Sequence, residues 1–293
     1  MRLAKRIQEL GLSQTASVME EARRLRESGI DVIDFGPGEP DLPTPDIAGR
    51  AAIQAVRENF THYTAVAGIG PLREAIARRL SLRNGPQITA EQVIVTCGAK
   101  QAIYNLCCSL FDQGDEVLIP RPYWVTFPEA VRLAGAEPRF VATASDTGFI
   151  PRREDLEAGI GSRTRGLIVN YPNNPSGAVL GKECLREIAG LAREKGIFLL
   201  SDETYDAFCY RDSGSRETSF LSVWDQEMEG LAVVGSFSKT FSMTGWRVGY
   251  AVASPGLVRK LAALQSHATG NASSISQKAA LAVLDEDPAD LEA

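Results

Sequence analysis

The sequence predicts an α/β fold in which a mainly parallel, mixed sheet of seven strands lies between two layers of helices. Three observations predict it. Short apolar runs rich in β-branched residues alternate along the chain with longer stretches of helical periodicity. These runs are almost continuously apolar rather than alternating, as expected of strands that are covered on both faces. The chain has 293 residues, 44% of them apolar, which suffices for the core of one large domain.

Seven runs make up the predicted sheet. The connection from Ser236 to Arg247 is too short for the helix of a parallel crossover, so we expect the last strand to be antiparallel. The predicted strands are Gln92–Cys97, Glu116–Pro120, Pro138–Thr143, Gly166–Asn170, Ile197–Asp202, Leu231–Ser236 and Arg247–Ala253. Helices are predicted over Pro71–Leu82, Lys100–Phe111, Tyr123–Ala134, Lys182–Lys195 and Pro255–Ser266.

The N-terminal part has a different organisation. An amphipathic helix is predicted near Ser17–Ser28, followed by a short strand, "DVIDF", over residues 31–35. The next stretch, "GPGEPDLPTP", is crowded with Gly and Pro, which marks an irregular segment between two structural units.

Charge and composition argue against several classes of function. The 31 Lys and Arg against 37 Asp and Glu give a net charge of −6, so no basic face for nucleic acid or anionic lipid is expected. Without a membrane-spanning run or the apolar centre of a signal peptide, we expect a soluble, cytoplasmic protein. The five cysteines lack metal-ligand or redox-pair spacing, and two histidines give little support to a metal site or a Ser-His-Asp hydrolase.

Ligands of open α/β sheets collect at the carboxyl ends of the strands, so the residues that follow each run are the candidates. The first run is followed by "GAKQ" at the start of a predicted helix. This segment is either a phosphate site, formed by the free N–H groups of the helix N-terminus, or an ordinary strand-to-helix turn. The second is followed by "RPYW", which brings Trp124 to the same edge as a stacking platform or as a core residue.

Three further strand ends carry polar groups. Asn174 in "YPNNPSG" is either an amide donor or a turn residue. Asp202 and Tyr205 in "SDETYDAF" end a strand expected to be central, where a carboxylate requires a cation, either a structural arginine or a protonated ring nitrogen. Lys239 in "SFSKTFSMTGWRVGY" is followed by Arg247, whose positive charge would favour the neutral form of the lysine amine, and a neutral amine can attack an aldehyde. Without the other strand ends, Lys239 would be read as a surface lysine.

Together these strand ends supply the groups needed to hold pyridoxal 5′-phosphate. They are a phosphate-binding turn (the phosphate cup, "GAKQ"), an aromatic side chain for stacking, an Asn, an Asp with a Tyr, and a Lys with an Arg. From "FGPGEPDLPTP" to its end the chain resembles the aspartate-aminotransferase-like (class I/II) aminotransferases of the fold-type-I pyridoxal-phosphate enzymes. The resemblance implies an enzyme that moves an amino group from an L-amino acid to a 2-oxo acid, working as a homodimer with shared active sites. It also implies a large cofactor-binding domain over residues 46–293 and the N-terminal segment of a small domain over residues 1–45.

The resemblance implies a role for each matching residue. Lys239 would bond covalently to the cofactor and then transfer the α-proton, Asp202 would pair with the pyridine nitrogen, and Tyr205 would complete the catalytic set. The cofactor-binding residues would be Gly98, Ala99, Lys100, Trp124, Asn174, Asp202, Tyr205, Ser236, Ser238, Lys239, Arg247 and, toward a neighbouring subunit, Tyr63. The substrate-binding residues would be Gly38, Trp124 and Asn174, and no metal is implied.

Two features depart from the family pattern. Lys100 takes a cup position where other members carry a small hydroxyl residue, so its ammonium either reaches the distal carboxylate of aspartate or glutamate or faces solvent. Family members continue for on the order of a hundred more residues, which form most of the small domain and include the arginine that binds the α-carboxylate. We therefore expect a truncated chain that lacks the C-terminal part of the small domain.

Two alternatives to the transaminase remain open at this point. One is a carbon–sulfur β-lyase on the same fold, which uses the same cofactor. The other is a non-catalytic cofactor-binding fragment.

Overall fold

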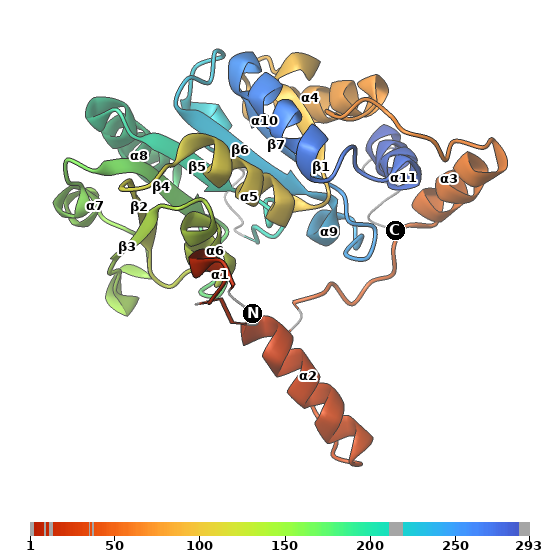
Figure 1. The fold of residues 1–293 in the computed structure, drawn as a ribbon, viewed down its shortest axis with the longest axis horizontal. Helices are drawn as coiled ribbons and strands as arrows, with labels where there is room; N and C mark the ends of the chain where they lie inside the picture. The colour runs from red at the N-terminus through yellow and green to blue at the C-terminus, as the bar shows by residue number, and fades with distance from the viewer. Residues whose placement is uncertain are drawn as a thin grey trace.

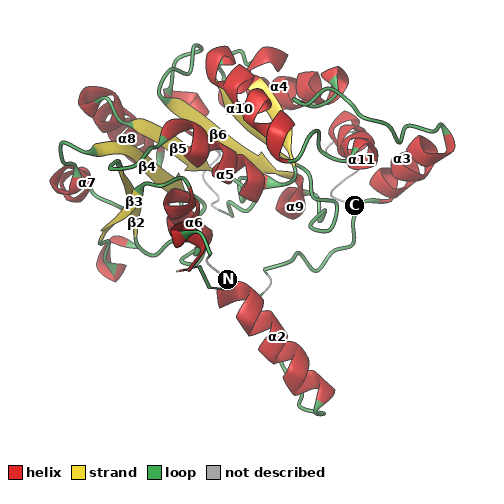
Figure 2. Ribbon diagram, in the orientation of Figure 1, coloured by secondary structure: helices red, strands yellow, loops and turns green. Residues whose placement is uncertain are grey.

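The computed structural model describes residues 3–8, 10–11, 14–34, 36, 38–210 and 219–286, which form a twisted sheet between two layers of helices (Figures 1 and 2). The sheet has seven strands, as predicted, and their order is β1-β7-β6-β5-β4-β2-β3. The strands are β1 Val93–Thr96, β2 Glu116–Pro120, β3 Glu137–Val141, β4 Thr164–Asn170, β5 Phe198–Asp202, β6 Leu231–Ser236 and β7 Gly249–Ala253.

The direction of β7 decides which residues meet at the functional edge of the sheet. This strand pairs antiparallel with both β1 and β6, whereas the other neighbouring pairs are parallel. Gly249, at the start of β7, therefore lies opposite Thr96 and Ser236, which end β1 and β6. The end of β4 is level with the end of β5, because Asn170 pairs with Asp202. The antiparallel direction of the last strand, predicted from the short Ser236–Arg247 connection, is thus confirmed.

Helices cover both faces of the sheet, and each face has its own apolar core. One core packs α4, α8 and α11 on the sheet, and the other packs α5, α6 and α10. No helix in the described part of the chain is both long and apolar enough to cross a membrane. The helices are α1 Lys5–Gln8, α2 Gln14–Glu27, α3 Asp46–Arg57, α4 Gly70–Asn84, α5 Ala99–Leu110, α6 Thr126–Leu133, α7 Arg153–Gly159, α8 Lys182–Lys195, α9 Phe237–Thr240, α10 Pro255–Ala268 and α11 Ser274–Asp285.

In the N-terminal segment, α1 lies beside α6, whereas α2 points outward from the sheet (Figure 1). The strand predicted over residues 31–35 is wrong for residues 31–34, which belong to no strand, and Phe35 lies outside the described residues. A strand needs a neighbour that satisfies its backbone N–H and C=O groups. Here the side chain of Ile33 is 82% exposed, and Gly36 donates its N–H to the Asp34 carboxylate. The apolar alternation alone therefore does not create a strand.

Candidate functional site

Asp202 ends β5 near the middle of the sheet and is 3% exposed. Its Oδ1 accepts the backbone N–H of Thr204 at 3.1 Å, and its own carbonyl accepts the side-chain amide of Asn170 at 3.0 Å. Burial raises the pKa of Asp202 to about 6, against the opposing effect of the Thr204 hydrogen bonds. Among the residues that the structure describes, no Lys or Arg pairs with this carboxylate, so it is a buried acceptor that lacks a cation.

Asn174 and Tyr205 meet beside this carboxylate. The Asn174 amide donates to the Tyr205 hydroxyl oxygen at 3.2 Å, and the Asn174 backbone N–H donates to Oδ1 of Asn170 at 2.9 Å. Burial raises the pKa of the Tyr205 hydroxyl, and the Asn174 hydrogen bond opposes this shift. An amide and a phenol that are held together in this way can orient a hydroxyl or phenolate of a ligand.

Lys239 lies in the one-turn helix α9, directly after β6. The turn is fixed at its start because the hydroxyl of Ser236 accepts the backbone N–H of Ser238 at 3.0 Å. The Lys239 ammonium donates to the carbonyl oxygen of Gly38 at 2.8 Å. Burial lowers the pKa of Lys239, the carboxylate of Glu39 raises it, and the guanidinium of Arg247 lowers it. The structure therefore places beside the end of β5 an amine that deprotonates more readily than a free lysine.

Gly98 and Arg247 form a close contact at the next strand ends. A Cβ atom on Gly98 would lie 2.6 Å from Nη2 of Arg247, so the guanidinium rests on a glycine. A Cβ on Gly249 would lie 2.7 Å from the backbone N of Ala99. Arg247 has a φ of +53° and donates through Nη1 to the carbonyl of Thr244 at 2.9 Å. The N-terminus of α5 and the Arg247 cation thus face the same small volume, as an anion site requires.

Ser236 and Ser238, both buried, end β6 and begin α9 beside this anion site. Trp124 follows β2 and packs edge-on against Phe127, with ring centroids 5.6 Å apart. The Lys100 ammonium lies 4.9 Å from the centroid of the Trp124 ring. Burial and the positive charge of Arg247 both lower the pKa of Lys100.

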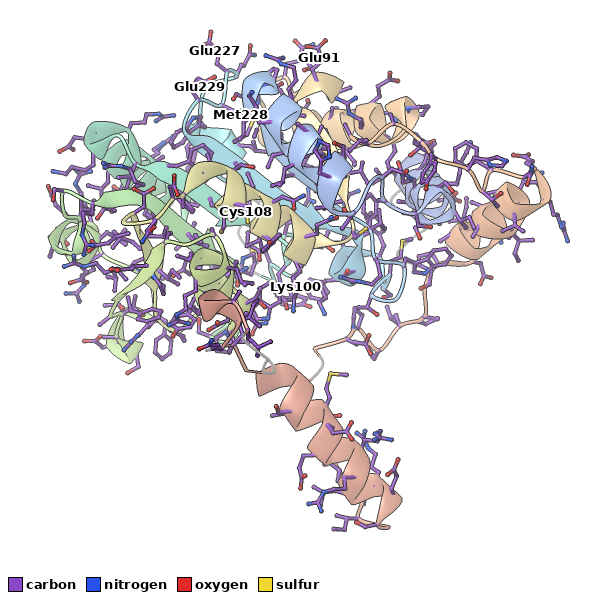
Figure 3. The ribbon with its side chains drawn as sticks, viewed as in Figure 1. Glu91, Lys100, Cys108, Glu227, Met228 and Glu229 are labelled. Carbon is purple, nitrogen blue, oxygen red and sulfur yellow. The ribbon has the colours of Figure 1, made fainter. Side chains whose placement is uncertain are left out.

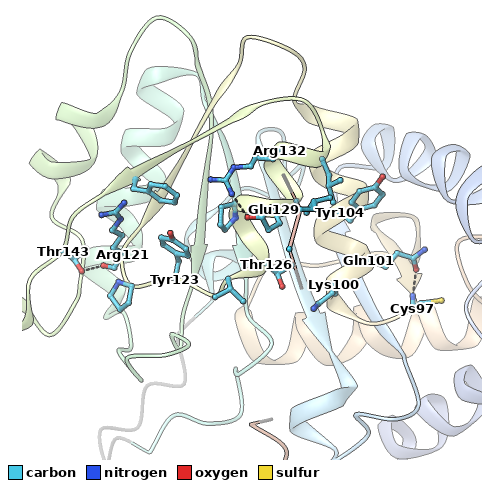
Figure 4. A pocket seen from close by; sticks show the side chains of 18 of the residues that line it. Cys97, Lys100, Gln101, Tyr104, Arg121, Tyr123, Thr126, Glu129, Arg132 and Thr143 are labelled. Atoms are coloured by element: carbon cyan, nitrogen blue, oxygen red, sulfur yellow. Dashed lines mark hydrogen bonds and ion pairs between the residues drawn. The ribbon is translucent and has the colours of Figure 1, made fainter. Parts of the chain in front are cut away.

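A large cavity of about 1160 Å³ begins at the first turn of α5 and continues along α6 (Figure 4). Lys100 lies at that turn (Figure 3) and lines the cavity with Tyr104 and Tyr123 (Figure 4). Arg247 lines it as well. Lys239 and Asp202 do not line it, so the cavity adjoins only the cationic end of the site. No cluster of three or more His, Cys, Asp or Glu that suits a metal ion occurs in the part of the chain that the structure describes.

Two predicted site residues lie outside this constellation or at its margin. Tyr63 is 95% exposed and lines a shallow groove with His267 and Asn271, away from the described residues at the strand ends. Gly38 joins the site through its carbonyl oxygen, which accepts from Lys239. Its φ of +57° suits a glycine.

Sequence reasoning missed Asn170 and Glu39. Asn170 is 4% exposed and links the ends of β4 and β5 through both atoms of its amide. Its signal was present, because a lone polar residue closes the apolar run "GLIVN". Glu39 gave no such signal, because its effect on Lys239 depends on a contact between segments about 200 residues apart.

The sequence matches the protein family described as "Aminotransferase class I and II" over residues 30–293. It is 40% identical over 282 residues to a probable aspartate/prephenate aminotransferase of Aquifex aeolicus, an alignment that covers 96% of this chain and 71% of that protein. An aspartate aminotransferase of Geobacillus stearothermophilus is 38% identical over the same share of each chain.

Solved structures give the same match. An aspartate aminotransferase from Thermus thermophilus, determined with maleate, superposes with a TM-score of 0.92 at 40% identity, covering 97% of this chain and 73% of that one. An aspartate aminotransferase from Thermotoga maritima superposes with a TM-score of 0.91 at 37% identity.

Proposed function

Because this chain belongs to the class I and II aminotransferases and is a transaminase, we propose that it takes the amino group of an acidic L-amino acid with pyridoxal 5′-phosphate as its cofactor. The acceptor is a 2-oxo acid. The observation that carries the proposal is the position of the buried, cation-free carboxylate of Asp202 at the same sheet edge as the perturbed amine of Lys239.

The residues present fit this cofactor. A protonated pyridine nitrogen is the cation that the Asp202 carboxylate lacks, and pairing would lower the pKa of Asp202 again. The N-terminus of α5 and Arg247 suit a phosphate, and Gly98 is the residue that leaves room for it, because a Cβ there would fill the space at the guanidinium. The Asn174–Tyr205 pair suits the ring hydroxyl. When bound, the cofactor supplies an aldehyde that takes up the amino group and a ring that accepts electron density.

The chain's own groups then act in fixed positions. Lys239 takes the proton from the substrate's α-carbon and delivers it to the cofactor carbon that is bonded to the transferred nitrogen. To take up the proton, Lys239 must be a neutral amine. Asp202 keeps the ring nitrogen protonated, and Asn174 with Tyr205 holds the tilt of the ring. Trp124 offers a flat face for stacking, and Ser236 and Ser238 provide further donors for the phosphate.

The acidic substrate class rests on Lys100. Its ammonium lies on the rim that joins the cofactor site to the large cavity, 4.9 Å from the Trp124 ring centroid. A cation at this distance from the stacking face is placed to pair with a second carboxylate. The names of the aspartate and aspartate/prephenate aminotransferases among the relatives agree with this choice.

We further propose that two copies of the chain share their sites, with Tyr63 of one copy directed at the phosphate of the other. Tyr63 is 95% exposed, and Ile53 and Val56 on the neighbouring helix α3 are more than half exposed. These apolar side chains suit a symmetric interface. The division into a large domain over residues 46–293 and the first segment of a small domain over residues 1–45 is proposed on the outward course of α2. Sedimentation analysis of the wild-type chain and of Val56→Glu tests the dimer.

Absorbance spectroscopy tests the function directly. Pyridoxal 5′-phosphate is added to the purified chain and to Lys239→Ala, and then L-aspartate or L-glutamate is added without any 2-oxo acid. We expect a Lys239-dependent band that converts once to the pyridoxamine form, with no release of ammonia. Continuous release of ammonia would instead indicate the β-lyase, and a band that ignores amino acids would indicate a cofactor-binding fragment. Failure to form any Lys239-dependent band would refute the site.

A further inference from the structure

Residues 38–44, which we call the strap, are fastened to the loop that carries Lys239 and Arg247. The carbonyl of Gly38 accepts from the Lys239 ammonium at 2.8 Å, and the carboxylate of Glu39 accepts from the Thr244 hydroxyl at 2.6 Å. At the far end of the strap, the Thr44 hydroxyl donates to the carbonyl of Ser242 at 2.7 Å.

A further hydrogen bond closes the same junction, because Trp246 donates its indole N–H to the Thr44 hydroxyl oxygen at 3.2 Å. These contacts join segments that are about 200 residues apart in the sequence. The strap is therefore held along the whole turn from Lys239 to Trp246, rather than at a single point.

Glu39 combines a mechanical and an electrostatic contact at this junction. Its hydrogen bond to Thr244 fixes the strap one residue after the carbonyl that holds Lys239. Glu39 and Arg247 are the charges that act on the pKa of Lys239, in opposite directions. The other titratable groups at this edge are Asp202, Tyr205 and, beyond Arg247, Lys100. Since the Glu39 side chain is exposed, solvent screens its charge, and the effect on Lys239 is that of a surface pair.

Building on the proposed function, we propose that Glu39 is a positioning residue that fixes the Gly38 carbonyl on the Lys239 amine and so increases the share of this amine that is protonated in the cofactor-free protein. The ammonium donates a stronger, charge-assisted hydrogen bond to the Gly38 carbonyl than the neutral amine does, and the negative charge of Glu39 also favours the ammonium. Capture of an aldehyde requires the neutral amine. Glu39 therefore slows the entry of the cofactor and is opposed in this by burial and by Arg247.

Competitive labelling of the cofactor-free protein with acetic anhydride tests the proposal. The acetylation of Lys239 is followed by peptide mass spectrometry between pH 6 and 11. Glu39→Gln keeps a side-chain oxygen that accepts from Thr244 and removes only the charge, whereas Thr244→Val keeps the charge and removes the hydrogen bond. Asp41→Asn, which removes an exposed carboxylate from the same strap, is the matched control.

We expect the Glu39→Gln profile to move to lower pH, with about two- to fivefold more labelling of Lys239 below its midpoint. Thr244→Val moves the profile in the same direction, and Asp41→Asn leaves it in place. The initial rate at which pyridoxal 5′-phosphate forms its Lys239-dependent band at pH 7.5 rises by the same factor in Glu39→Gln. A Glu39→Gln profile that coincides with the wild-type or the Asp41→Asn profile overturns the proposal. The labelling does not use the cofactor, so a failure of the proposed function would show separately, as a wild-type chain that forms no band.

Discussion

Replacement of Gly98 by alanine tests the anion site most sharply, because the structure gives the size of the disturbance. Gly98 has φ 79° and ψ 167°, a backbone conformation that is essentially restricted to glycine. The new Cβ would lie 2.6 Å from Nη2 and 3.2 Å from Cζ of Arg247. An ordinary contact begins near 3.4 Å, so the guanidinium must retreat by about 0.8 Å.

Two consequences follow for Gly98→Ala. The backbone conformation costs about 1–3 kcal/mol of stability, which lowers the melting temperature by a few degrees in a chain of this size. Displacing the guanidinium should weaken the proposed charge-assisted hydrogen bond to phosphate, worth about 1.5–3 kcal/mol, so we expect the Kd for pyridoxal 5′-phosphate to rise by about 10- to 100-fold.

Thermal unfolding of the cofactor-free protein and absorbance titration with the cofactor measure the two effects of Gly98→Ala. The matched control is Gly245→Ala in the loop before Arg247, since a Cβ on Gly245 meets no atom within 4 Å. If Gly98→Ala bound the cofactor as tightly as Gly245→Ala does, the contact between Gly98 and Arg247 would have no part in holding the phosphate.

Three further predictions follow from the structure. Burial raises the pKa of Glu203 to about 7, so the stability that its proton contributes is present below pH 4.5 and is lost as the pH rises through 7. In denaturant unfolding measured across this pH range, Glu203→Gln should remove about 3 kcal/mol of the change in the free energy of unfolding. If the free energies of unfolding of Glu203→Gln and of the wild type changed in parallel with pH, the prediction would be wrong. Lys100→Met should lower kcat/KM for aspartate by about 10- to 100-fold and leave alanine unaffected, and an equal loss for both donors would refute the carboxylate role. A Cβ on Gly235 would lie 2.2 Å from the Tyr250 ring, so Gly235→Ala should cost about 1–3 kcal/mol in thermal unfolding, and unchanged melting would show that the ring moves freely.

The sheet could be predicted from the sequence because its strands are local signals. Apart from the edge strand β3, where Arg139 is exposed, the runs from Gln92 onward are largely apolar and buried. The length of the Ser236–Arg247 connection implied the direction of β7. The sequence analysis missed helix α3. One side of this helix is exposed, and the other packs mainly on α11, a partner that cannot be identified from the local sequence. The strand expected at residues 31–35 failed for the opposite reason, because a pattern that suits a strand found no neighbour.

The candidate site divides in the same way. The sequence allowed three site residues to be proposed because each lies at or just after the end of a recognisable strand: Asn174, Asp202 and Lys239. The structure brings the ends of these strands to one edge of the sheet. The contacts of Glu39 with Thr244 and of Arg83 with Asp206 could not be anticipated, because each pairs groups more than 100 residues apart. Whether two distant charges meet depends on the register and packing of the intervening chain, which local patterns do not contain.

The antiparallel direction of β7 has a consequence for how this site tolerates change. Since β7 returns directly beside β6, only the seven residues 240–246 separate Lys239 from Arg247 along the chain. The length of this connection limits how far the amine of Lys239 can lie from the guanidinium of Arg247, the proposed phosphate-binding cation. An insertion elsewhere on the molecule leaves this limit unchanged, whereas one inserted residue between Lys239 and Arg247 would change it.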